Sequence, residues 1–330
     1  MVDGNDFFKR GERRPMTGIK ATRVLAQDQV ACEPLAMSSS SVPLRALAML
    51  AVISLVWGTV WPLLPVVLRE VSVWTFRALT MLPSAVLLLA LARARGLSIR
   101  IPRAHWPVLV GSALCFLAVW NVAAAYSAIL IPSGQTAVLG FTMPLWSALL
   151  SWLVLRQRLG GRQLAAIALG GLAVGLLMWP GLAHYAQAPA GFALGLGAGL
   201  GWAVGTLILQ RRPIPVSSLA LTGWQLLIAG LPIAVGAWLF ADHHWFLPSW
   251  PTTAAIVYIA LVPMSLGTLL WFAIVRMLPA SIAGLSAIMV PIVAMISGAL
   301  IHGEPLGPLQ LAAMACCAGS LTLVMIKRSS

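Results

Sequence analysis

The feature that most constrains this chain is a succession of ten long apolar runs. A helix needs roughly twenty apolar residues to cross about 30 Å of hydrocarbon. The runs are continuously apolar rather than alternating, which excludes membrane β-strands and leaves helices to satisfy the backbone polar groups in lipid. The sequence therefore predicts an all-α polytopic membrane protein with ten transmembrane helices, over residues 46–68, 72–92, 106–125, 133–155, 162–178, 190–208, 219–240, 254–275, 281–301 and 308–325.

Charged residues are scarce and are found between the apolar runs. They make up 9% of the chain, whereas about a quarter of an ordinary soluble domain is charged. The net charge of +13 would suggest a nucleic-acid partner if the basic residues formed a polar domain. They are loop residues instead, so we predict the lipid bilayer as the partner and no nucleic acid.

The distribution of basic residues predicts the orientation. If the N-terminus is inside, the outer loops contain only Arg69 of the basic residues near the spans. Because Lys and Arg stay on the cytoplasmic side, both termini are expected in the cytoplasm. Together with the composition, this favours a bacterial inner membrane. The inner loops contain Arg93, Arg95, Arg100, Arg103, Arg156, Arg158, Arg162, Arg211, Arg212, Arg276, Lys327 and Arg328.

Residues 1–44 differ from everything that follows. They are polar, mix both charges and lack apolar periodicity, so we predict a disordered cytoplasmic tail. Met37 directly precedes the first apolar run and is a candidate alternative start of translation.

The remaining chain contains an internal repeat. An offset of 147 residues matches prolines, a glycine and a glutamine in two copies, and offsets of 145 and 148 match a tryptophan pair and an Arg–Gln pair. We therefore expect a first repeat at 45–180 and a second at 181–330, each with five spans. Five is odd, so the second copy enters the membrane from the opposite side, as in transporters with alternating access. The matched pairs are Pro132–Pro279, Pro144–Pro291, Gly160–Gly307, Gln163–Gln310, Trp57–Trp202 and Arg77–Gln225.

Several stretches resemble a known family. They are LVWGTVW in the first span, Arg77 in the second, SGQTAVLGFTMPLWSALLSWL in the fourth and HGEPLG after the ninth. Together with the two five-helix copies, they are similar to the EamA family of the drug/metabolite transporter superfamily. The resemblance implies a ten-helix exporter of amino acids or related metabolites, with Gly303 and Glu304 as the family's Gly-Glu pair. The first copy departs from this pattern with Arg156 and Gln157.

Large aromatic and polar side chains inside the spans are the candidates for a substrate cavity. Aromatic rings can enclose a small solute, and polar groups in lipid need a partner on another helix or in a wet cavity. Packing between helices is the alternative for each of them. The candidates are Trp57, Trp61, Trp120, Asn121, Gln135, Thr142, Trp202, Gln225, Thr268 and Trp271.

Arg77 is the clearest charge inside a span. An intramembrane charge marks a functional site by default. It could bind a substrate carboxylate or pair with Glu70, seven residues earlier on the same helix face. From the sequence we favour the structural pairing.

Pro144 and Pro291 are the candidate hinges. Proline removes a backbone hydrogen bond and kinks a helix, which can open a crevice or can simply be static geometry. Both prolines occupy the middle of their predicted spans.

No Asp or Glu falls in the central part of any predicted span. We therefore expect transport of neutral or zwitterionic solutes without proton coupling. The four cysteines have no ligand spacing, so no metal or cofactor is predicted.

Competing functions follow from the same spans. A lipid flippase of the same fold and a non-transporting scaffold stay open. An intramembrane enzyme is disfavoured because the sequence has no GxSxG or HExxH motif and no paired Asp in its spans. Since one chain contains both repeats, we expect a functional monomer.

Overall fold

The computed structural model describes residues 44–131, 133–156, 159–240, 247–278, 289–302 and 306–325. The regular elements in these ranges are all helical, and they belong to one compact unit, Ser41–Ser330. Met37, the predicted tail and the Gly303–Glu304 pair lie outside the described residues.

The first repeat forms five helical spans. The elements are α2 (Leu44–Gly58) with α3 (Val60–Leu68), then α4 (Val73–Ala94), then η1 (Arg103–His105), α5 (Trp106–Ala113), η2 (Leu114–Val119) and α6 (Trp120–Leu130), then α7 (Ser133–Gly140) with α8 (Met143–Leu155), then α9 (Gly161–Met178) with η3 (Trp179–Gly181). All five are long and apolar enough to cross a membrane.

The second repeat follows a short connecting helix. The elements are α10 (Leu182–Gln187), α11 (Pro189–Arg211), α12 (Ser218–Phe240), α13 (Trp250–Ile259) with η4 (Ala260–Gly267) and α14 (Thr268–Met277), α16 (Met289–His302) and α17 (Pro308–Met325). Three of these spans are long enough to cross, and α16 and α17 complete the predicted ten.

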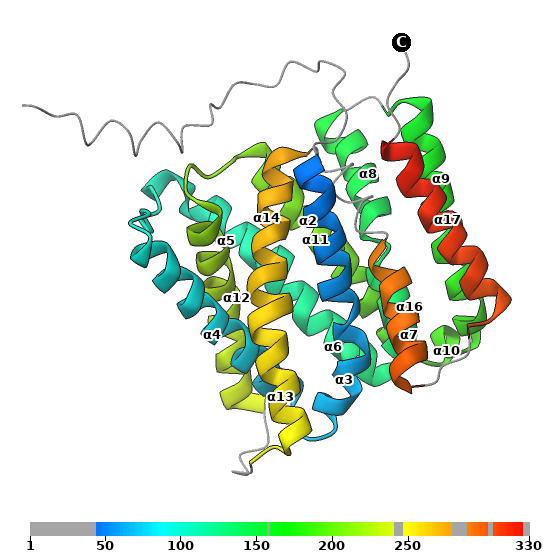
Figure 1. The fold of residues 1–330 in the computed structure, drawn as a ribbon, viewed down its shortest axis with the longest axis horizontal. Helices are drawn as coiled ribbons and strands as arrows, with labels where there is room; N and C mark the ends of the chain where they lie inside the picture. The colour runs from blue at the N-terminus through cyan, green and yellow to red at the C-terminus, as the bar shows by residue number, and fades with distance from the viewer. Residues whose placement is uncertain are drawn as a thin grey trace, which may run out of the picture. The chain divides into compact units, whose positions relative to one another are not determined.

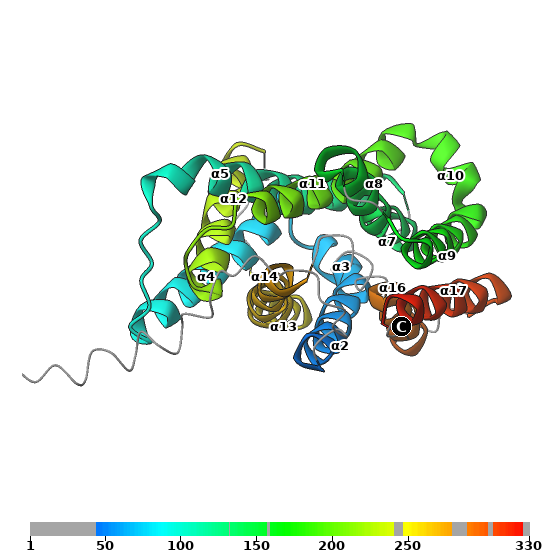
Figure 2. The ribbon, with the colours of Figure 1, turned by 90° about the horizontal axis from the view of Figure 1, so that it is seen from above.

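Helix packing reproduces the two-fold repeat. The second and seventh spans, α4 and α12, pack along each other, as do the fifth and tenth, α9 and α17. In Figures 1 and 2 these two pairs lie at opposite ends of the row of helices. A second pair of contacts follows the same symmetry. The first span packs against the ninth through α2 and α16, and its equivalent, the sixth span, packs against the fourth through α11 and α8. The fold is therefore a pair of inverted five-helix repeats, as the sequence predicts.

The third and eighth spans share a local irregularity. Each is 28 residues long, and each changes from α- to π-helical geometry near its middle, at η2 and η4. Such π-turns are rare and often occur at functional sites. In η4 the turn contains Pro263, which has no N–H to donate, and the Ser265 hydroxyl bonds the Ala260 carbonyl at 2.8 Å.

The first and fourth spans are interrupted instead. Thr59 separates α2 from α3, and Phe141 and Thr142 separate α7 from α8. Pro144 is therefore near the start of α8, where a proline costs no helical hydrogen bond. Pro291 is the third residue of α16 as described. The fourth span is therefore interrupted just before Pro144, whereas the sequence predicted a kink at that proline within a continuous helix.

A central aromatic pocket as the candidate functional site

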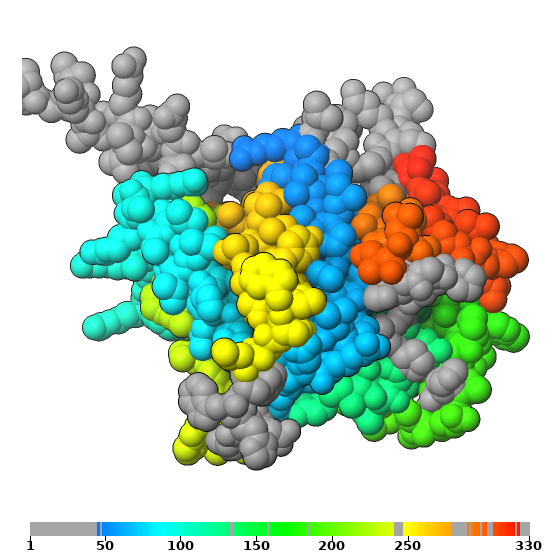
Figure 3. All heavy atoms as spheres, turned by 60° about the horizontal axis from the view of Figure 1, so that its bottom comes forward, coloured from blue at the N-terminus to red at the C-terminus, as the bar shows by residue number. Residues whose placement is uncertain are grey.

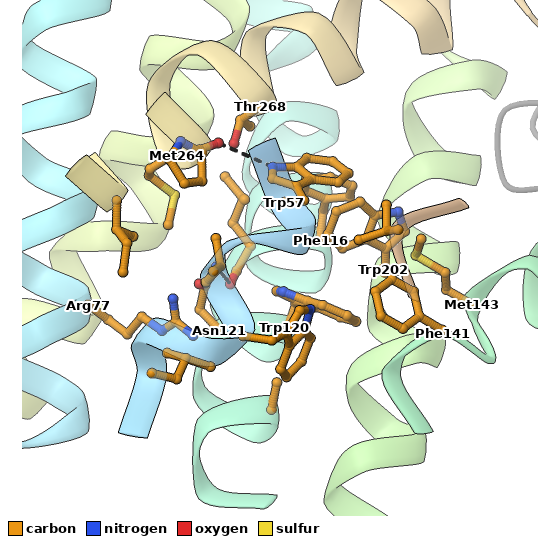
Figure 4. A pocket seen from close by; sticks show the side chains of 18 residues that line it. Trp57, Arg77, Phe116, Trp120, Asn121, Phe141, Met143, Trp202, Met264 and Thr268 are labelled. Atoms are coloured by element: carbon orange, nitrogen blue, oxygen red, sulfur yellow. Dashed lines mark hydrogen bonds between the residues drawn. The ribbon is translucent and has the colours of Figure 1, made fainter. Parts of the chain in front are cut away.

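A pocket of about 90 Å³ opens at the centre of the helical unit. It is bounded by helices of both repeats, and Figure 4 shows their side chains converging on it. A water needs about 10–15 Å³ of such space, so the pocket has room for roughly six to nine waters, on the order of 200 Å³ of liquid. That volume suits a small metabolite. The lining residues are Trp57, Val60, Trp61, Leu64, Arg77, Phe116, Leu117, Trp120, Asn121, Ala124, Phe141, Met143, Trp202, Ile259, Pro263, Met264, Thr268 and Val290.

Equivalent positions of the two repeats form much of the pocket wall. Lining residues of η2, α6 and α8 in the first repeat are equivalent, at the sequence offset of 147 residues, to lining residues of η4, α14 and α16 in the second repeat. The pocket therefore lies where the two repeats meet, which is where transporters built from inverted repeats bind their substrates. The lining pairs are Phe116–Pro263, Leu117–Met264, Asn121–Thr268 and Met143–Val290, with Trp57–Trp202 at an offset of 145.

Trp202 is the centre of the aromatic wall. Its ring centroid lies 4.2 Å from that of Phe116, 4.8 Å from Trp120, 5.1 Å from Trp57 and 5.2 Å from Trp271. Most of these contacts are edge-to-face, the geometry that aromatic quadrupoles favour. The rings form a rigid apolar surface that can contact a flat or aliphatic solute.

The two equivalent tryptophans differ in their hydrogen bonds. The Nε1–H of Trp57 donates to the Pro263 carbonyl at 3.2 Å, so the π-turn of η4 fixes that ring. A side chain on Gly267 would meet Trp57 Nε1 at 2.5 Å, which explains the glycine there. Trp202 Nε1 is buried and has no hydrogen-bond partner in the described part of the chain. An acceptor on a bound solute would remove the cost of that unpaired donor.

Arg77 brings a positive charge into this apolar site. It is 5% exposed, lines the pocket from α4 and extends toward Asn121 and Trp120 (Figure 4). Its Nε atom has no hydrogen-bond partner among the described residues, and its guanidinium carbon lies 4.8 Å from the ring centroid of Phe76.

The pairing of Arg77 with Glu70 that we favour from the sequence is not formed. Glu70 accepts hydrogen bonds from Ser249, with Oε2 2.7 Å from the backbone nitrogen and Oε1 2.6 Å from Oγ. These bonds to the ionised form lower the pKa of the Glu70 carboxyl. They connect the loop after α3 to the start of α13, and Figure 3 shows α3 (blue) and α13 (yellow) side by side on that face.

The sequence-predicted site residues fall into two groups. The larger group, which lines the pocket, is Trp57, Trp61, Arg77, Trp120, Asn121, Trp202 and Thr268. The others lie outside the lining. Trp271 packs behind Trp57 and Trp202, and Gln225 donates from Nε2 to Ser112 Oγ at 2.7 Å.

Thr142 and Gln135 lie on the fourth span and are outside the pocket lining. Thr142 Oγ1 donates to the Leu139 carbonyl at 2.6 Å and accepts from Trp146 Nε1 at 3.1 Å. The Thr142 side chain therefore forms hydrogen bonds to both helices that flank the break, α7 and α8. Gln135 packs against Gly181 near the end of the fifth span.

Sequence reasoning missed several apolar lining residues. Phe116, Pro263 and Met264 are ordinary span residues by type. The internal repeat contained a signal for two of them, because Phe116 and Pro263 are equivalent at the offset of 147. Each of the two also precedes a predicted polar site residue by five positions, Phe116 before Asn121 and Pro263 before Thr268. A π-turn joins residues five positions apart by a hydrogen bond, so the two positions lie about one turn apart on the same side of their spans.

Comparisons with known proteins agree with this fold. The sequence profile of the EamA-like transporter family matches residues 44–179 and again 189–326. This double match defines a multi-pass membrane transporter built from two related halves. The chain belongs to the EamA-like transporter family.

Individual relatives are more distant. The Bacillus subtilis protein named "Uncharacterized transporter YvbV" is 24% identical over 86% of this chain and 92% of its own length. A Salmonella typhimurium protein named "Probable amino-acid metabolite efflux pump" is 32% identical over 55% of this chain and 64% of its own length. One crystal structure superposes with a TM-score of 0.71 at 20% identity, covering 87% of this chain and 99% of that one.

Proposed function

We propose that this transporter exports neutral or aromatic amino acids through the central pocket, by alternating access and without proton coupling. The observation that carries the proposal is the aromatic pocket formed by equivalent residues of the two repeats. The name of the Salmonella typhimurium relative supports the same substrate class. We place the transporter in a bacterial inner membrane with both termini in the cytoplasm, on the basis of its arginine distribution.

The pocket suits a small solute better than a lipid. Its walls are mostly aromatic and aliphatic, with Arg77, Asn121 and Thr268 as polar side chains. A few polar groups in an apolar pocket are typical of small-molecule sites, where they orient the ligand.

The absence of proton coupling rests on the acidic residues. Within the described ranges Glu70 is the one acidic residue, and it is exposed and bonded to Ser249, outside the pocket lining. A carboxyl that takes up and releases protons as the substrate moves would have to contact the pocket. We infer transport along the amino-acid gradient.

The breaks in the spans give alternating access a structural basis. Thr59 and the Phe141–Thr142 pair interrupt helices beside the pocket, and η2 and η4 loosen two more. We propose that Pro144 and Pro291 mark the helix segments that move. Irregular turns can absorb such a change because they have fewer regular hydrogen bonds to break.

The test is flux of labelled amino acids in proteoliposomes, with and without an imposed proton gradient. Phenylalanine and leucine should equilibrate at rates that the gradient leaves unchanged. Trp202→Ala should lower the flux at least about tenfold, whereas Trp152→Ala is the matched control because Trp152 is 55% exposed and outside the pocket lining. Uphill accumulation that a protonophore abolishes would contradict the mechanism, and no flux of either solute would reject the substrate class.

A further inference from the structure

We propose that the pocket recognises a carboxylate attached to an apolar or aromatic body, with Arg77 as the counter-charge, and that a substrate ammonium group contributes nothing to binding. The inference rests on the proposed function, because it assigns the substrate chemistry of the same pocket. It predicts that acids without an amine are bound as well as amino acids.

The first step is the charge balance of the pocket. Arg77 is buried and lines the pocket. The part of the chain that the structure describes offers it no carboxylate, since Glu70 is bonded to Ser249. A buried charge is expected to be paired. A substrate carboxylate would supply the missing charge, and the planar guanidinium can bind it through two parallel hydrogen bonds.

The second step is the contrast with the other repeat. Gln225 is equivalent to Arg77 at the offset of 148 and is fully buried, but it is neutral. Its Nε2 donates to Ser112 Oγ, and it is absent from the pocket lining. The helix packing needs no cation at this position in α12. The positive charge in α4 is therefore a feature of one side of the pocket rather than a requirement of the repeat.

The third step concerns the other end of the solute. Trp57 and Trp202 lie on the side of the pocket away from Arg77 (Figure 4). A carboxylate on Arg77 directs the rest of a small molecule toward these rings. An aromatic or branched aliphatic body would bury apolar surface there.

The fourth step concerns the ammonium group of an amino acid. None of the lining residues in the described ranges is acidic. Asn121 Nδ2 donates to the Leu117 carbonyl, so the side-chain oxygen of Asn121 is one neutral acceptor available to an amine. An ammonium group would also share the pocket with the cationic Arg77, and like charges repel strongly where water is excluded. The amine would lose its hydration without gaining a counter-charge.

The experiment compares three probes by isothermal titration calorimetry on the full chain in lipid nanodiscs. 3-Phenylpropanoate and 3-phenylpropanamide have the same shape and differ in the carboxylate, while phenylalanine adds the amine. The acid should bind roughly 10- to 100-fold more tightly than the amide, the value expected for a hydrogen-bonded charge. Phenylalanine should bind no more tightly than the acid.

Variants then assign the effect to Arg77. Arg77→Gln installs the residue of the other repeat and should make the acid and the amide bind equally, and Arg77→Lys should retain part of the preference. Arg69→Gln is the matched control, since Arg69 is an exposed arginine of the loop between the first two spans. If Arg77→Gln does not fold, the comparison of acid with amide in the wild type still decides the question.

Three results would overturn the inference. They are equal binding of acid and amide by the wild type, phenylalanine binding more than about tenfold more tightly than the acid, and binding of neither phenylpropanoid. A failure of phenylalanine flux in proteoliposomes, with the preference for acid over amide intact, would reject amino-acid export and leave the carboxylate site standing.

Discussion

The second and seventh spans, α4 and α12, occupy equivalent places in the two repeats and pack along each other, yet they differ in what they contribute to the pocket. Arg77 of α4 lines it with a charge, whereas Gln225 of α12 is bonded to Ser112 behind the wall. The helix packing and the polar pair Asn121–Thr268 follow the two-fold symmetry, while the charge of Arg77 does not. The repeat therefore specifies the scaffold, and we infer that the asymmetric charge of Arg77 selects the solute.

The largest expected difference concerns the tryptophan pair. Trp202→Ala should destabilise the protein by about 3–5 kcal/mol, the range for truncation of a buried tryptophan, because Trp202 contacts four other rings. Trp57→Ala should cost less, since Trp57 is only partly buried and contacts two rings. Unfolding titrations in detergent measure both, and equal losses would show that the two tryptophans are interchangeable.

The next effect tests a close helix contact. Gly205 is equivalent to Val60 at the offset of 145, but a Cβ at Gly205 would lie 2.7 Å from the backbone nitrogen of Phe116. Gly205→Val, which copies the first repeat, should destabilise the protein by about 1–3 kcal/mol or more and shift η2. Gly197→Ala is the control, because a Cβ at Gly197 meets no atom within 4 Å.

The same unfolding assay applies to this pair. A midpoint for Gly205→Val that matches the control would mean that α11 can move away from η2 without cost.

A smaller effect is expected at the Gln225–Ser112 hydrogen bond. Ser112→Ala removes the acceptor of the Gln225 amide, whose Oε1 already has no partner among the described residues. The nitrogen and the oxygen of the buried amide would then both lack a partner among the described residues, which should lower the free energy of unfolding by about 1–3 kcal/mol. Gln225→Met removes the amide itself and should cost less than about 1 kcal/mol, because no polar group is left unsatisfied.

The double variant sharpens this result. Ser112→Ala combined with Gln225→Met should be more stable than Ser112→Ala alone, which a double-mutant cycle detects as coupling. Additive losses would show that the hydrogen bond is not formed in the membrane.

The sequence predicted the architecture well because membrane spans are specified by length and apolarity, and the repeat by matched prolines and tryptophans. Eight of the predicted spans are long apolar helices in the structure, and α16 and α17 supply the rest. Seven of the residues proposed for a substrate cavity, including Trp202 and Asn121, line the pocket. The rest depended on local geometry.

Two errors show what local geometry adds. The π-turns that turn Phe116 and Pro263 into the pocket leave no mark in apolar periodicity. The pairing of Arg77 with Glu70 followed from helix spacing, but α4 begins at Val73, after Ser72 caps it, so the two residues do not share a helix. The Ser72 Oγ accepts a hydrogen bond from the Thr75 nitrogen at 3.2 Å and fixes that start.

The smallest effect concerns the two ends of the eighth span. At one end Glu70 accepts two hydrogen bonds from Ser249, and at the other Arg276 donates to the Val216 carbonyl. The contact between Glu70 and Ser249 depends on pH, because the hydrogen bonds from Ser249 lower the pKa of the Glu70 carboxyl from its ordinary value of 4.5. A carboxyl with a depressed pKa in the folded state stabilises that state above its unfolded pKa, and the contribution is lost as the pH falls through the folded value.

Glu70→Gln should therefore lower the thermal unfolding midpoint slightly at pH 7. Its difference from the wild type should shrink as the pH falls from about 4.5 and disappear once the pH has passed the lower pKa of the carboxyl in the folded state. Since Glu70 is exposed, the shift should be small. Ser249→Ala should reproduce part of the effect, because it removes the hydroxyl donor and leaves the backbone N–H of residue 249 bonded to Glu70. Adding Ser249→Ala to Glu70→Gln should change the midpoint less than Ser249→Ala changes it in the wild type, because the two side chains share one contact. A difference between wild type and Glu70→Gln that stays constant from pH 7 to pH 3 would mean that Glu70 acts through packing, and that this end of the span is no more sensitive to acid than the end fixed by Arg276.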